Sequence, residues 1–296
     1  MALVATLIAN PSNPVLAPAI AEKAADAVKA SGLYWLADGI ACDIALKDGT
    51  VLTEAETALR AAIEGLPIDL AIQDVDTRRK KFLIADMDST MIGQECIDEL
   101  AAEVGLKEKV SAITARAMNG EIAFEPALRE RVALLKGLPV TVVDEVIAKR
   151  ITLTPGGPEL IATMKAKGHY TALVSGGFTV FTSRIAATLG FHENRANILI
   201  EDNGALAGAV EEPILGKQAK VDALIDITGK LGIDPADVIA VGDGANDLGM
   251  LELAGSGVAL HAKPAVAAQA KIRIDHGDLT ALLYLQGYRK ADFVAP

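Results

Sequence analysis

Cysteine and aromatic residues are scarce in this chain of 296 residues. The two cysteines, Cys42 and Cys96, lie far apart with no C-x-x-C spacing, so they form neither a disulfide framework nor a zinc site. Such sparse cysteine is typical of proteins in a reducing compartment, and we expect a cytoplasmic location. Aromatic residues make up 4% of the chain and hydrophobic residues 51%, a balance that favours an α/β protein with an aliphatic core.

Positive charge and long apolar runs are also lacking. Lys and Arg number 28 against 39 Asp and Glu, a net charge of −11, which argues against a nucleic-acid partner because that partner requires a basic surface. No apolar run approaches the roughly 18–20 residues of a membrane span. Residues 2–9 are apolar but short, and they lack the basic flank of a signal peptide. We therefore expect no membrane association.

What the chain does contain is a set of polar side chains at the ends of three predicted strands. The apolar runs and the residues that follow them are 82–85 with Asp86 and Asp88, 172–174 with Ser175 and Gly176, and 238–241 with Asp243 and Asp247. Because open α/β sheets bind ligands at the carboxyl ends of their strands, we expect these groups to converge. Carboxylates suit Mg²⁺, and hydroxyl and amide groups suit phosphate oxygens. The pattern predicts a phosphate site with a bound Mg²⁺.

The order of predicted elements divides the chain into two domains. Residues 1–77 alternate strands and helices in a small α+β unit without a Gly-rich phosphate loop. The basic run at 78–81 is interpreted as a solvated linker. Residues 78–296 alternate strands and helices, which predicts a doubly wound parallel sheet covered on both faces. Within this second domain, apolar residues at helical spacing predict a helical cap at about 93–152.

The motifs also carry a family resemblance. Four stretches in order resemble the motifs of haloacid dehalogenase-type phosphatases: Asp86-Met87-Asp88-Ser89-Thr90, Ser175-Gly176-Gly177, Lys220 in Gln218-Ala219-Lys220, and Gly242-Asp243-Gly244-Ala245-Asn246-Asp247. The run Glu95-Cys96-Ile97-Asp98-Glu99-Leu100 is similar to the phosphoserine phosphatases within that family. The resemblance covers about residue 80 to 285.

The resemblance implies a catalytic role for each acidic motif residue. Asp86 is expected to be the nucleophile that forms an aspartyl phosphate, with attack by water as the chemical alternative. Asp88 is expected to be the general acid and base. The expected ligands of Mg²⁺ are Asp86, the backbone carbonyl of Asp88, and Asp243, with Asp247 orienting groups around the metal.

The same resemblance assigns the groups that hold the substrate. Ser175 and Gly176 are expected to donate to the phosphoryl oxygens, and Lys220 to neutralise their charge, although spacing alone does not separate Lys220 from Lys217. Asn246 is an expected substrate contact, with a helix N-cap as its alternative role. In the cap, Glu95 is expected to meet an ammonium group and Arg131 a carboxylate, beneath the apolar cover of Met118 and Phe124. Taken singly, Met118 and Phe124 also fit ordinary helix core, and Arg131 fits a surface charge.

The sequence therefore predicts a Mg²⁺-dependent phosphatase that hydrolyses phosphoserine to serine and phosphate through an aspartyl phosphate. An enzyme that transfers the phosphoryl group to another alcohol, such as homoserine, is an open alternative. So is a regulatory protein in which residues 1–77 carry the function, although a pure sensor has no need of a nucleophile. By the same resemblance, the N-terminal unit is expected either to bind serine as an effector or to serve as a structural or dimerising element.

Overall fold

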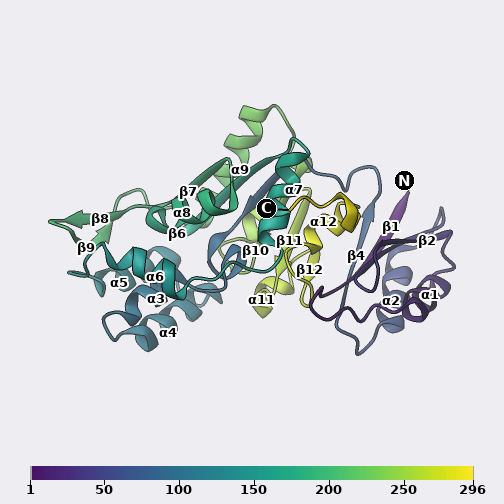
Figure 1. Ribbon diagram of the computed structural model, residues 1–296, viewed down its shortest axis with the longest axis horizontal. Coiled ribbons are helices and arrows are strands. Elements are labelled where there is room, and N and C mark those ends of the chain that lie inside the picture. The colour runs from purple at the N-terminus through teal and green to yellow at the C-terminus, as the bar shows by residue number, and fades with distance from the viewer. Residues whose placement is uncertain (1, 296) are drawn as a thin grey trace.

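A computed structural model describes residues 2–295 and places a parallel sheet at the centre of the molecule (Figure 1). The sheet has six strands in the order β12-β11-β10-β5-β6-β7, and every neighbouring pair is parallel. The strands are β5 (Phe82–Ala85), β6 (Tyr170–Phe178), β7 (Glu193–Asn197), β10 (Val238–Gly242), β11 (Ser256–Leu260) and β12 (Ile272–Ile274). The strand order reverses between β5 and β10, and this is where doubly wound sheets bind ligands. The predicted doubly wound core is confirmed.

Helices cover both faces of this sheet because its strands are apolar on both sides. Alternate residues such as Ile84 and Ala240 pack with α9 and α10 on one face, and their neighbours Leu83 and Val241 pack with α7, α8 and α12 on the other. The helices are α7 (Gly157–Ala166), α8 (Thr179–Leu189), α9 (Lys217–Leu231), α10 (Leu248–Leu253), α11 (Pro264–Ala267) and α12 (Ala281–Leu285). Strand β7 and helix α11 were not predicted.

Between β5 and β6 the chain leaves the core and forms the four helices that the apolar spacing predicts. They are α3 (Cys96–Ala102), α4 (Lys107–Met118), α5 (Phe124–Ala133) and α6 (Val142–Arg150), and they form the cap at the left of Figure 1. The predicted hairpin, β8 (Leu199–Asp202) and β9 (Ala205–Val210), reaches across from the core. Its backbone bonds to the cap segment at Gly137, Leu138 and Val140. The cap is thus tied to the core by its own two connections and by this hairpin.

The N-terminal unit lies on the opposite side of the core from the cap (Figure 1). Its antiparallel sheet has four strands in the order β2-β3-β1-β4. One face packs on its own two helices, and Ile8, Ala41 and Ala71 on the other face share a hydrophobic cluster with α12. The elements are β1 (Leu3–Ala9), α1 (Pro18–Ala27), β2 (Gly32–Ala37), β3 (Ala41–Ala45), α2 (Leu52–Ala62) and β4 (Ile68–Asp74), of which β2 was not predicted.

The basic segment at 78–81 joins the two domains, and the prediction that it is a solvated linker is wrong for two of its residues. Arg78 forms an ion pair with Asp43 at 2.8 Å, and both side chains are largely buried. Lys80 is 4% exposed, and its Nζ donates to the backbone oxygen of Ala236 at 2.7 Å. Arg78 is enclosed because β3 of the N-terminal sheet packs on the core, and Lys80 is enclosed by the core residues Ala236 and Gln286. Among the described residues, no helix has both the length and the apolar composition needed to cross a membrane.

Candidate active site

Strand β5 delivers the first two carboxylates into a tight turn at residues 87–91. Asp86 follows the strand directly, its backbone N–H donates to the oxygen of Val241 on β10, and its Oδ1 accepts from the N–H of Met87 at 2.8 Å. Ser89 has a φ of 54°, which reverses the chain and keeps both carboxylates at the strand end. The Oδ1 of Asp88 accepts from the N–H of Cys96 at 3.0 Å. The turn at residues 87–91 is therefore bonded to the first helix of the cap.

Strand β10 delivers the second pair of carboxylates. Asp247 folds back so that its Oδ2 accepts from the N–H groups of Asp243 at 3.1 Å and Gly244 at 3.0 Å. This return needs glycine at position 242, because a Cβ there would overlap the side chain of Asp247. The Oδ2 of Asp243 is buried and has no hydrogen-bond partner within residues 2–295. Asp247 thus shapes the loop, while Asp243 presents an open oxygen.

Lys220 lies between the two strand ends and is 2% exposed. Its Nζ is 2.7 Å from Oδ1 of Asp86 and 2.5 Å from Oδ1 of Asp247. Lys217 is exposed, and its Cε would lie 3.7 Å from a Cβ at Gly249, so its side chain runs along α10. Of the two lysines that spacing could not separate, only Lys220 reaches the acidic cluster.

The carboxylates converge closely enough to hold one cation. One oxygen from each of Asp86, Asp243 and Asp247 lies within 4.8 Å of the others. Both oxygens of Asp247 are already engaged, by Lys220 and by the backbone of its own loop. The Oδ2 of Asp243 has no hydrogen-bond partner within residues 2–295, and the Nζ of Lys263 lies 3.8 Å from it. A hard divalent cation would satisfy this oxygen, so the donor set fits Mg²⁺.

Burial of several like charges changes their protonation. Burial, and then the charge of Asp247, raises the pKa of Asp86 above its ordinary range against the opposing effect of Lys220. Burial and the charge of Asp86 raise the pKa of Asp88 to about 6. Burial, followed by the charges of Asp247, Glu95 and Asp86, raises the pKa of Asp243 well above its usual value. Without a cation, the cluster therefore resists full ionisation.

The carboxyl-terminal part of β6 carries the hydroxyl and glycine residues. The Oγ of Ser175 accepts from the N–H of Gly177 at 2.9 Å and lies 3.5 Å from Oδ2 of Asp88. A Cβ at Gly177 would lie 2.6 Å from the Asp88 carboxylate, so only glycine lets the loop pass beneath Asp88. Ser175 and Gly176 therefore line the same cavity as the two β5 carboxylates.

The cap closes this cavity with the residues predicted for it. Glu95, Met118, Phe124 and Arg131 all line the cavity together with Asp86 and Asp88. The Oε1 of Glu95 accepts from the hydroxyl of Ser89 at 2.6 Å. Burial, and then the charge of Asp88, raises the pKa of Glu95 to about 7.

Arg131 is a buried charge and not a surface one. It is 5% exposed, and its Nη1 donates to the hydroxyl of Thr114 at 3.0 Å. Thr114 in turn donates to Asp98 at 2.7 Å. No carboxylate pairs with Arg131 within residues 2–295, whereas Arg129 is exposed and pairs with Glu212. Sequence reasoning missed the support from Thr114 and Asp98, for which the motifs gave no signal.

Asn246 also lines the cavity, and its Oδ1 is buried without a hydrogen-bond partner in the described chain. Helix α10 begins at Leu248 with Asp247 at the N-cap position, and no side chain caps it. The structure thus brings Asn246 to the cavity and gives it no capping bond.

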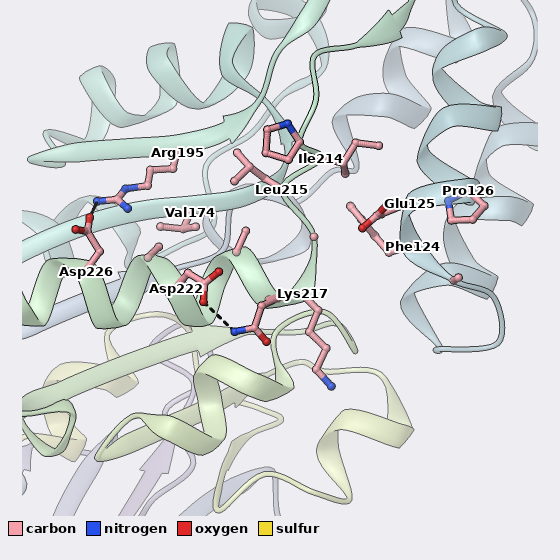
Figure 2. Close-up of a pocket in the computed structure, with 16 residues that line it drawn as sticks. Phe124, Glu125, Pro126, Val174, Arg195, Ile214, Leu215, Lys217, Asp222 and Asp226 are labelled. Carbon is pink, nitrogen blue, oxygen red and sulfur yellow. Dashed lines mark hydrogen bonds and ion pairs between the residues drawn. The ribbon is translucent and has the colours of Figure 1, made fainter.

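An outer cleft of about 750 Å³ adjoins the cavity on its other side (Figure 2). Phe124 lines both spaces, and Ile214, Leu215 and Lys217 line the cleft across from it. A Cβ at Gly176 would lie 2.8 Å from the Cζ of Phe124, so the ring of Phe124 rests against Gly176. Phe124 therefore separates the enclosed cavity from the cleft.

Comparisons with known proteins agree with this geometry. A family model described as haloacid dehalogenase-like hydrolase matches residues 83–252. A phosphoserine phosphatase of Polaromonas sp. is 46% identical over 226 residues, which are 75% of this chain and 96% of that protein. A HAD family hydrolase from Salmonella enterica serovar Typhi has a similar structure, with a TM-score of 0.84 at 30% identity over 96% of this chain and 98% of that one. A phosphoserine phosphatase with a phospho-aspartyl intermediate analogue is 44% identical, with a TM-score of 0.67 over 70% of this chain and 98% of that one.

The buried oxygen of Asp243 that accepts no hydrogen bond leads to a prediction about stability. Replacing Asp243 with Asn removes one of the crowded charges, so in a chelating buffer near neutral pH we expect the melting temperature to rise by about 3 °C or more. The same variant should lose the stabilisation that added Mg²⁺ gives the wild type. Thermal unfolding with and without Mg²⁺ measures both effects. Glu252→Gln, an exposed change of the same charge on α10, is the matched control and should change neither. A lower melting temperature for Asp243→Asn in chelator would contradict the prediction.

Proposed function

The chain belongs to the haloacid dehalogenase-like hydrolases, and on this premise we propose that it is a phosphoserine phosphatase in which Asp86 carries the phosphoryl group. The observation that supports the proposal best is that one cavity is lined by two sets of residues with different chemistry, one from the core and one from the cap. Asp86 and Asp88 line it from the core, while Glu95 and Arg131 line it from the cap. A phosphate monoester of an amino acid has complementary groups at both of its ends.

In the first step, a carboxylate oxygen of Asp86 attacks phosphorus in line and forms an acyl phosphate. The bond between phosphorus and the seryl oxygen breaks, and Asp88 gives its proton to that oxygen. A pKa near 6 for Asp88, raised by burial and by Asp86, suits a group that must hold a proton close to neutral pH. The products of this step are serine and aspartyl phosphate.

In the second step, the carboxylate of Asp88 takes a proton from a water molecule, whose oxygen attacks phosphorus. The bond between phosphorus and the Asp86 oxygen breaks, so Asp86 regains its carboxylate and inorganic phosphate is released. Transfer to another alcohol would follow the same route with that alcohol in place of water. How the phosphoryl group divides between water and another alcohol is a prediction, and analysis of the products with and without that alcohol tests it.

The groups on β6 and α9 hold the phosphoryl oxygens during both steps. Ser175 offers a hydroxyl and Gly176 a backbone N–H at the end of β6. Lys220 balances the charge that spreads over the phosphoryl group. Its two ion pairs, with Asp86 and Asp247, hold the ammonium beside the nucleophile before substrate arrives.

Members of this family generally use a divalent metal, and we propose Mg²⁺ held by the carboxylates of Asp86 and Asp243 and by the backbone oxygen of Asp88. When bound, the ion supplies positive charge that offsets the repulsion between the nucleophile and the phosphate. Asp247 keeps the Asp243 loop in shape through two backbone hydrogen bonds. Its engaged oxygens support a positioning role and not direct ligation.

Selectivity comes from the cap. Glu95 faces the expected ammonium group, and Arg131 has free guanidinium donors for a carboxylate, since its structural bonds use only part of its five N–H groups. Met118 and Phe124 exclude water above the reacting bond.

The roles of the N-terminal unit remain predictions. It lies far from the catalytic cluster, on the other side of the core (Figure 1), which supports a regulatory or dimerising role for it and not a chemical one. A serine effector and self-association are both compatible with this placement. Cys42 and Cys96 are free buried thiols, which supports the proposed cytoplasmic location.

The nucleophile assignment predicts the behaviour of Asp86→Asn. An amide cannot form the acyl phosphate, so we expect turnover of phosphoserine to fall by a factor of about 10³ or more. Rapid-quench experiments should also show no burst of phosphoryl transfer to the protein. Glu252→Gln is the control, and it should keep both the turnover of phosphoserine and the burst. A variant that retained a burst of phosphorylated protein would show that another residue is the nucleophile.

The specificity assignment predicts the behaviour of Arg131→Ala. Removing a buried charged donor should lower kcat/KM for phosphoserine by about 30- to 100-fold. The effect should be much smaller for phosphoethanolamine, which lacks the carboxylate. Arg129→Ala, two positions away on the exposed face of α5, should change neither value by more than about twofold. Equal losses for both esters in Arg131→Ala would contradict a role in carboxylate recognition.

A further inference from the structure

We infer that Asn197 is a positioning residue for the reaction, and that its side-chain amide holds together the two elements that grip the phosphoryl group. The inference rests on the proposed function and adds a residue that belongs to none of the four motifs. Asn197 is the last residue of β7 and is 2% exposed. A polar side chain at this depth requires hydrogen-bond partners.

All of its partners are backbone atoms of two functional segments. The Nδ2 of Asn197 donates to the oxygen of Gly176 at 2.9 Å and to the oxygen of Leu215 at 3.2 Å. Its Oδ1 accepts from the N–H of Leu215 at 2.7 Å. One amide group thus bonds to a loop at the end of β6 and to the chain that enters α9.

The loop needs this support because it leaves the sheet. Strands β6 and β7 pair in register from Ala172 to Val174, and the register then shifts before Phe178 pairs with Asn197. The three residues between, 175–177, oppose a single residue of β7, so they bulge away from the ladder and lose its hydrogen bonds. The side-chain amide of Asn197 donates to the oxygen of Gly176 and so replaces one of the lost hydrogen bonds. This bond fixes the peptide group between Gly176 and Gly177, within the segment that faces the phosphoryl oxygens.

The second segment carries the catalytic lysine. Leu215 lies two residues before α9, and Lys220 lies in the first turn of that helix. Two hydrogen bonds from one side chain hold Leu215 at both its N–H and its oxygen. The start of α9 is therefore fixed relative to the β6 loop, and with it the distance between Lys220 and Gly176.

The same segment also meets the cap. A Cβ at Gly216 would lie 3.4 Å from the Cδ1 of Phe124, so the ring rests against the residue that follows Leu215. Figure 2 shows Leu215 and Ile214 facing Phe124 across the outer cleft. Asn197 therefore supports the surface against which the cap closes, as well as the two phosphoryl-binding elements.

The test compares two buried amide side chains that both bond to backbone. Asn197→Leu removes the three hydrogen bonds and keeps the branched outline of the side chain. Gln286→Leu is the matched control: Gln286 is 1% exposed, accepts from the N–H of Lys80 and donates to the oxygen of Leu282, far from the cavity. Both variants should lower the melting temperature. Only Asn197→Leu should weaken binding of inorganic phosphate in Mg²⁺, by about tenfold or more in calorimetry, with a similar fall in kcat.

Serine binding separates positioning from general damage. Serine is the product of the proposed reaction, so it should compete with phosphoserine through the proposed cap contacts at Glu95 and Arg131. The constant for this competitive inhibition should change by less than about twofold in Asn197→Leu. Asn197→Ser retains one hydroxyl and should lie between wild type and Asn197→Leu in phosphate affinity. Phosphate affinity within about twofold of wild type in Asn197→Leu would overturn the inference. An equal loss of serine binding and phosphate binding would also overturn the inference. So would a result in which both Asn197 variants are unfolded while Gln286→Leu is folded.

The outcome also distinguishes this inference from the function on which it rests. A wild-type protein that binds phosphate but does not hydrolyse phosphoserine contradicts the proposed function alone. A wild-type protein that hydrolyses phosphoserine, with Asn197 variants that bind phosphate normally, contradicts the inference alone.

Discussion

The structure depends on one electrostatic constraint, the crowding of buried carboxylates around a single point at the switch of strand order. One oxygen each of Asp86, Asp243 and Asp247 lies within 4.8 Å of the others, and Lys220 is the buried cation that pairs with two of them. Burial and mutual repulsion raise the pKa values of Asp86 and Asp243, so the folded chain gains from any cation that enters. In the proposed function, a divalent ion and a phosphate would together balance the charges of this arrangement.

The rest of the fold holds this cluster in place from three directions. The topology brings β5 and β10 side by side, so that residues 86 and 243 meet although they are distant in sequence. Helix α3 bonds to Asp88 through the N–H of Cys96, which links the cap to the proposed general acid. The end of β7 contributes Asn197, which spans the gap that the bulged β6 loop leaves in the sheet. Each contact fixes a reacting group through backbone atoms, and such contacts are less mobile than those between long side chains.

The sequence indicated which residues come together at the candidate site because their chemistry is visible in residue type and spacing, and the structure places them around one cavity. Apolar runs that end in Asp86 and Asp243 identified two strand ends, and helical spacing identified the four cap helices.

The sequence could not predict the features that depend on tertiary contact. Strand β7 is short and polar, so its pattern did not indicate a strand, and Asn197 gave no signal. Arg78 and Lys80 resemble solvated linker residues, but Arg78 pairs with Asp43 of the N-terminal sheet and Lys80 bonds to Ala236 of the core. Thr114 and Asp98 support Arg131 only because α3, α4 and α5 pack together. Position 220 was preferred to 217 by resemblance, and the ion pairs of Lys220 give the physical reason.

The central claim is that buried carboxylates destabilise the protein until a divalent cation binds, and thermal unfolding across pH tests it most directly. Carboxyl groups whose pKa is raised on folding stabilise the folded state below their ordinary pKa, and this contribution is lost as pH rises through the raised values, about 6 for Asp88 and about 7 for Glu95. In chelator, the melting temperature of the wild type should therefore fall as the pH rises from about 4 to about 7, the interval between the ordinary and the raised pKa values. In excess Mg²⁺ the fall should largely disappear, because the ion favours the ionised carboxylates. The same pH dependence with and without Mg²⁺ would contradict the account.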